Sequence, residues 1–161
     1  MKLQEILEEL KETVHYKNFI SKNPDAFFCA GFFIFDIKNS DEQIQLDFFI
    51  PKLKKIASFE FPFAAAKIHD DPIQENSPQD PAIKIDIDDV IAFSKKTIAI
   101  HESRLSPTKI IAVLQKGSWN LTCMDEALGI IRIKVDATTE EELSFDKGSL
   151  MDFMGIQKGK S

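Results

Sequence analysis

The spacing of hydrophobic positions changes from helical to alternating within the first half of the chain. Residues 2–20 carry apolar side chains every three or four positions, with acids between them, which predicts an amphipathic helix. After a turn signal at Pro24, strands are predicted at 26–37, 43–50 and 55–61. The first strand is expected to bulge or bend at Ala30-Gly31. Residues 64–68 predict either a fourth strand or one helical turn.

The second half of the chain shows the same order of elements. A helix is predicted at 89–101, with Asp88 as its N-cap. Strands then follow at 109–116, 119–124, 130–136 and 142–145. Gly148-Ser149 is expected to open a last helical turn at 150–154.

This repeated order predicts an α+β fold built from two helix-plus-antiparallel-sheet units in tandem. Their sheets would either join into one continuous sheet or pack on each other. Three prolines and several acids separate the two halves, which is typical of a linker. The predicted boundaries are an N-terminal unit at 1–68, an acidic Pro-rich linker at 69–82, a C-terminal unit at 83–155 and a frayed tail at 156–161.

The C-terminal unit resembles a PepSY-type domain, of the cystatin-like α+β group, over about residues 85–147. The resemblance rests on the helix IDIDDVIAFSKKTI, on a hairpin whose second strand begins at Trp119, and on the turn at 136–139. Where the family pattern favours Gly, this chain has Glu140, so that turn should be either more open or strained by an unfavourable φ. The resemblance implies a non-catalytic module that binds or restrains a partner, and it implies no catalytic residue. The N-terminal unit resembles the family only through the repeat.

Phenylalanine is concentrated in the N-terminal unit, where eleven of the 14 residues lie between Phe19 and Phe63. The predicted strands carry Phe on both faces, but one helix covers only one face. The second unit, a second copy of the chain or a ligand must therefore cover the other face. We expect a homodimer through this sheet, or else a protein partner, with a small apolar ligand in a Phe-rich pocket as the alternative. The candidate binding residues are Trp119, Phe33, Phe35 and Phe48.

Trp119 has two possible roles, as a core residue of a hairpin or as the aromatic wall of a concave pocket. The compact cluster His69-Asp70-Asp71 suggests a second alternative function, a metal-dependent enzyme. No GxSxG, GxGxxG or GxxxxGK motif is present. We therefore predict no catalytic residue, no cofactor and no metal ligand, and a non-enzymatic binding or assembly module.

The charge pattern excludes some partners. The net charge is −6, and the bases are almost all lysines, with only Arg104 and Arg132, which argues against sequence-specific nucleic-acid binding. The acids between 70 and 89 indicate either a solvated linker or a surface for a cation or basic partner. No apolar run is long enough to span a membrane, and we expect no signal peptide. With Cys29 and Cys123 expected to be buried free thiols, the predicted location is cytoplasmic.

Overall fold

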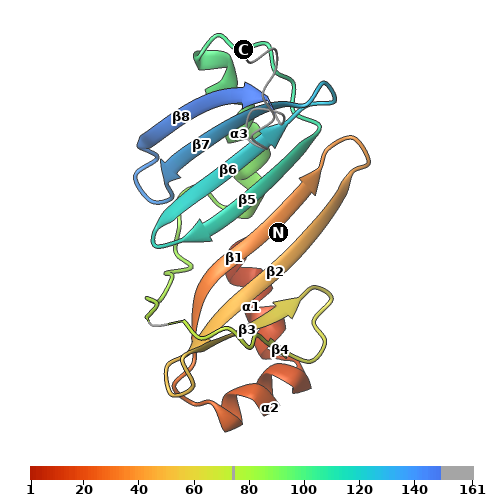
Figure 1. The fold of residues 1–161 in the computed structure, drawn as a ribbon. Coiled ribbons are helices and arrows are strands. Elements are labelled where there is room, and N and C mark those ends of the chain that lie inside the picture. Colours follow the sequence, from red (N-terminus) through yellow and green to blue (C-terminus); the bar gives the residue numbers. More distant parts are fainter. Residues whose placement is uncertain (74, 150–161) are drawn as a thin grey trace, which may run out of the picture.

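All eight strands of the described chain belong to one antiparallel sheet (Figure 1). A computed structural model describes residues 1–73 and 75–149. The strand order is β4-β3-β2-β1-β5-β6-β7-β8. The strands are β1 (Phe27–Asp36), β2 (Asp41–Ile50), β3 (Lys55–Glu60), β4 (Lys67–Ile68), β5 (Lys109–Gln115), β6 (Ser118–Met124), β7 (Gly129–Asp136) and β8 (Glu142–Ser149). The helices are α1 (Leu3–Lys11), α2 (Val14–Lys22), a 3-10 turn η1 (Ile87–Asp89) and α3 (Val90–Ile100).

The predicted tandem of two helix-plus-sheet units is wrong, because β1 and β5 pair directly along the middle of the sheet. Their register runs from Ala30 opposite Gln115 to Asp36 opposite Lys109. Strand β1 begins the meander β1–β4, and strand β5 begins the meander β5–β8. If the two meanders were separate, each of these strands would leave a row of unpaired N–H and C=O groups at a sheet edge. Pairing the two edges satisfies both rows. The result is a single sheet with one central seam, the β1–β5 seam.

In the view of Figure 1, α1 and α3 lie behind the sheet, and α2 lies below its lower end. Helix α1 buries its apolar stripe against the sheet, and α2 brings Tyr16 and Phe19 onto Phe48 and Phe59 with ring centroids 5.3–6.1 Å apart. The core runs continuously along this covered face from β3 to β7. Its largest fully buried side chains include Trp119, Phe33 and Phe59, together with Leu46, Leu114 and Leu121.

The single helix predicted for 2–20 is two helices that break at Thr13. Thr13 has an extended backbone, with φ −77° and ψ 149°, and its hydroxyl oxygen accepts a hydrogen bond from the Tyr16 N–H at 3.1 Å. A side chain that caps a new helix in this way competes with continuation of the previous one. Apolar periodicity carries no information about that competition.

Residues 84–87 connect the two halves on the covered face. The Asp86 carboxylate accepts the N–H of Leu3 at 2.7 Å and that of Ile87 at 2.8 Å, so one side chain caps both α1 and η1. The predicted N-cap, Asp88, is wrong, because Asp88 lies within η1 and Asp89 takes the N-cap position of α3. The Trp119 indole N–H donates to the Ile85 carbonyl oxygen at 2.7 Å.

Two predictions about the strands need correction. The bulge in β1 lies between Phe28 and Ala30, one residue before the predicted site. Strand β8 continues to Ser149, so residues 148 and 149 are extended and do not open a helix. The helical turn expected at 150–154 and the tail at 156–161 lie outside the described residues.

Candidate functional site

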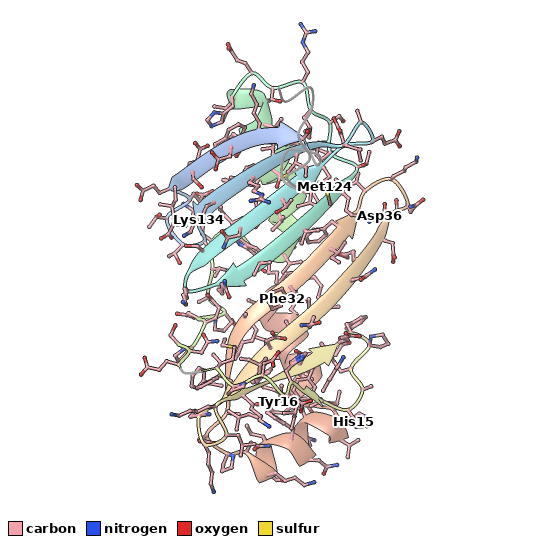
Figure 2. All side chains as sticks on the ribbon, in the orientation of Figure 1. His15, Tyr16, Phe32, Asp36, Met124 and Lys134 are labelled. Carbon is pink, nitrogen blue, oxygen red and sulfur yellow. The ribbon has the colours of Figure 1, made fainter. Side chains whose placement is uncertain are left out.

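The side of the sheet opposite the helices is the candidate site, and we call it the open face. In Figure 1 this side faces the viewer, and none of the helices within residues 1–73 and 75–149 crosses it. Figure 2 places Phe32 near its middle, with Asp36 and Met124 toward its upper end and Lys134 on the C-terminal half. Strand alternation assigns every second residue of each strand to this face.

One end of the open face is covered by the chain between β4 and α3, which crosses the lower ends of β1 and β2 (yellow to green in Figure 1). The Ile73 N–H donates to the Lys54 carbonyl at 2.7 Å, and the Gln79 N–H donates to the Phe28 carbonyl at 2.9 Å. The Gln79 side chain is buried and accepts the Gly117 N–H at 2.9 Å. A second small core lies beneath this segment, made of Cys29, Ala30, Phe49 and Ile56.

Beyond that segment, four apolar side chains line the β1–β5 seam without a helix over them. Phe32 stands opposite Val113, and Ile34 stands opposite Ile111. All four are half-buried. We call Phe32, Ile34, Ile111 and Val113 the apolar row.

On the strands nearer the apolar row, exposed charges of opposite sign lie on its two sides, whereas the edge strands β4 and β8 carry Lys67 and Asp146 on this face. On the N-terminal side, Asp41 and Glu60 point to the open face and are exposed. On the C-terminal side, Lys109 and Lys134 point to it and are exposed. Shallow hollows flank the row, one of about 290 Å³ that includes Phe32, Gln45 and Glu60 in its lining, and one of about 150 Å³ that includes Asn120, Thr122 and Lys134.

A buried polar cluster sits on the same face near the covering segment. The Ser58 hydroxyl donates to Asp47 Oδ1 at 2.6 Å and lies 2.7 Å from His69 Nε2. Gln45 Nε2 donates to the same Asp47 oxygen at 3.0 Å. Because the one proton of the Ser58 hydroxyl goes to Asp47, His69 Nε2 is the donor to Ser58. Burial raises the pKa of Asp47, while the hydrogen bonds from Ser58 and Gln45 oppose that rise.

The structure separates the predicted cluster His69-Asp70-Asp71. His69 turns toward Ser58 and Asp47, whereas Asp70 and Asp71 are exposed. Within residues 1–73 and 75–149, no group of three or more His, Cys, Asp or Glu side chains is placed to hold a metal ion.

The four predicted binding residues lie on the covered face, in the core. Trp119 and Phe33 are fully buried with ring centroids 5.6 Å apart, and Phe48 is 2% exposed. Phe35 is 3% exposed and lines the edge of a hollow of about 400 Å³ beside Ile87 and Ile91. The apolar row was not predicted from the sequence. The alternation of the strand could have indicated the apolar row, because Phe32 and Ile34 are the sequence neighbours of the candidates Phe33 and Phe35 and therefore point to the opposite face.

The two thiols are buried, as predicted. Burial raises the pKa of Cys29 to about 12 and that of Cys123 to about 11, so neither is a reactive thiolate at neutral pH. Among the described residues, no helix is long and apolar enough to cross a membrane.

Comparison with known proteins found no match for this chain among protein-family models, curated proteins or solved structures. The resemblance to PepSY-type domains therefore stays a prediction.

Proposed function

We propose that this chain is a non-enzymatic binding or assembly module whose docking surface is the open face of the sheet. The observation that supports this most strongly is the apolar row on the helix-free side of the central seam. In most antiparallel sheets with one covered face, the other face alternates to polar residues. Here the two central strands keep Phe32, Ile34, Ile111 and Val113 at those positions.

The energy available from this surface is suited to protein association. Full burial of a Phe, Ile or Val side chain contributes about 1.5–3 kcal/mol, and these four are already half-buried. At most about a third of that contribution therefore remains for a partner to supply. The charged and amide side chains around the row match the polar rim of a typical interface.

The two alternative functions have less support. The Phe and Trp residues suggested for a ligand pocket are buried in the core. A carrier would have to use either the hollow of about 400 Å³ whose edge Phe35 lines or the shallow hollows of the open face. For the metal-dependent enzyme, His69 contacts Ser58 and does not form a cluster with Asp70 and Asp71. We also propose a cytoplasmic location, which two buried free thiols suit because a reducing compartment keeps thiols unpaired.

Site-specific photo-crosslinking in the native host tests the proposed surface. A photoreactive phenylalanine analogue at Val113 is expected to capture a protein, because that side chain would lie inside the interface. The matched control is the same analogue at Val14, which is 62% exposed on α2, on the helix side. Adducts from position 113 that are absent from position 14 support the proposal. Equal adducts from both positions, or none from 113, would overturn it.

A further inference from the structure

We propose that the occupant of the open face is a second copy of this chain, packed face to face about a two-fold axis that runs along the β1–β5 seam. This inference rests on the proposed function and names its partner. It follows from the register of the strands, which gives the open face a self-complementary pattern.

The geometry of such a dimer follows from the strand order. A two-fold axis lying in the interface along the seam places β1 of one copy over β5 of the other. In the same way β2 lies over β6, and β3 lies over β7. We say that residues share a level when they are paired with one another across the strands of the sheet. Residues on one level of one copy then meet residues on the same level of the other copy, apart from the crossing angle of about 30° that twisted sheets adopt when they stack.

The apolar row meets itself in this arrangement. Phe32 and Val113 share one level, and Ile34 and Ile111 share the next. Phe32 of each copy therefore packs on Val113 of the other, and Ile34 packs on Ile111. The row forms one continuous apolar strip at the centre of the interface, where binding energy is usually concentrated.

Opposite charges meet on both sides of the strip. Glu60 pairs with Gln45, which pairs with Phe32, so Glu60 lies on the Phe32 level. Lys134 pairs with Asn120, which pairs with Val113, so it lies on the same level at an equal distance across the seam. The two-fold axis places Glu60 of each copy opposite Lys134 of the other.

The remaining positions are also complementary. Asp36 and Lys109 share a level on the two seam strands. The two-fold axis therefore places Asp36 of each copy opposite Lys109 of the other copy. Gln45 meets Asn120 in the same way. No like charges are brought together at these levels. A random surface would seldom match at five pairs of positions on three successive levels, and this match is the argument for a second copy rather than an unrelated protein.

Sedimentation equilibrium on the purified full chain tests the inference. The wild type is expected at twice 18.3 kDa at micromolar concentration. Val113→Lys should be monomeric, because it places a charge at the centre of the apolar strip. Glu60→Lys and Lys134→Glu should each weaken the dimer about tenfold, since two attractive pairs become repulsive. The matched control, Glu8→Lys, makes the same charge change on an exposed α1 position and should leave the dimer intact.

Mixing the variants separates this geometry from any other dimer. An equimolar mixture of Glu60→Lys and Lys134→Glu should recover the affinity of the wild type, because both cross-copy pairs are restored. The chain that carries both changes should recover it too. Far-UV circular dichroism establishes that each variant is folded.

Two results would overturn the inference: a wild-type chain that stays at 18.3 kDa at high micromolar concentration, or charge variants whose mixture is no tighter than either alone. A monomeric wild type together with photo-crosslinking to a different protein at position 113 would leave the proposed function standing. If the chain neither self-associates nor crosslinks to another protein, the proposed function and the proposed dimer are both refuted.

Discussion

Replacing Asp86 by Ala should destabilise the whole chain, because this one carboxylate caps helices from both halves. It accepts the Leu3 N–H at 2.7 Å at the start of α1 and the Ile87 N–H at 2.8 Å at the start of η1. The side chain is only 7% exposed, so water cannot replace it at either site without rearrangement.

The expected loss is about 3 kcal/mol. A hydrogen bond to a charged acceptor contributes about 1.5–3 kcal/mol, and loss of a helix cap costs about 0.5–2 kcal/mol. The two bonds share one acceptor and are not fully additive. For a chain of this size the melting temperature should fall by about 6–12 °C. Asp86→Asn keeps an acceptor oxygen and should lose about 1 kcal/mol.

Equilibrium unfolding in urea, followed by the emission of Trp119 and by far-UV circular dichroism, measures the effect. Asp88→Ala is the matched control, since its side chain is 44% exposed and its ion pair with Lys2 spans 3.8 Å at the surface. It should change the free energy of unfolding by less than about 0.5 kcal/mol. Equal losses for Asp86→Ala and Asp88→Ala would refute the shared-cap reasoning.

Three further predictions concern stability. Trp119→Ala should cost about 3–5 kcal/mol, because it empties a fully buried site and leaves the Ile85 carbonyl without its donor; a loss below 1 kcal/mol in urea unfolding would contradict this. Glu140→Gly should raise stability by about 0.5–1 kcal/mol, because Glu140 has φ 68°; a fall in melting temperature would show that its ion pair with Lys84 matters more. Asp47→Asn should change the pH dependence of stability. Because the folded pKa of Asp47 lies above its unfolded value, the wild type loses stability from this group as pH rises above about 4. The free energy of unfolding of the wild type relative to Asp47→Asn should therefore be lower at pH 7 than at pH 4, and an unchanged difference would count against a raised pKa.

Local features of the fold could be predicted from the sequence, because they depend on neighbouring residues. The apolar alternation predicted a strand at 55–61, and β3 occupies Lys55–Glu60. The departure from glycine at Glu140 predicted either an open turn or an unfavourable φ, and the second is confirmed. The β1–β5 seam could not be predicted in this way, because which free edges pair depends on contacts between residues about 80 positions apart.

The sequence did not show which face of the sheet the helices leave open, for a related reason. Alternation shows that Phe33 and Phe35 share one side of β1 and that Phe32 and Ile34 share the other, but not which side the helices cover. The bulge between Phe28 and Ala30 also changes the alternation within the strand. Only the placement of α1, α2 and α3 on one face shows that Phe32, rather than Phe33, is available to a partner.

Cross-linking between engineered cysteines tests most directly whether open faces meet as proposed. One copy carries Glu60→Cys and the other Lys134→Cys, and a short bismaleimide joins thiols that lie close together. Burial keeps the pKa of native Cys29 at about 12 and that of Cys123 at about 11, so the wild type should not react and serves as the control.

The account predicts a cross-linked band at twice 18.3 kDa from the mixture, and chains that stay single when either variant is treated alone, because like positions lie on opposite sides of the seam. A band of equal strength from either variant alone, or no band from the mixture, would contradict the face-to-face arrangement.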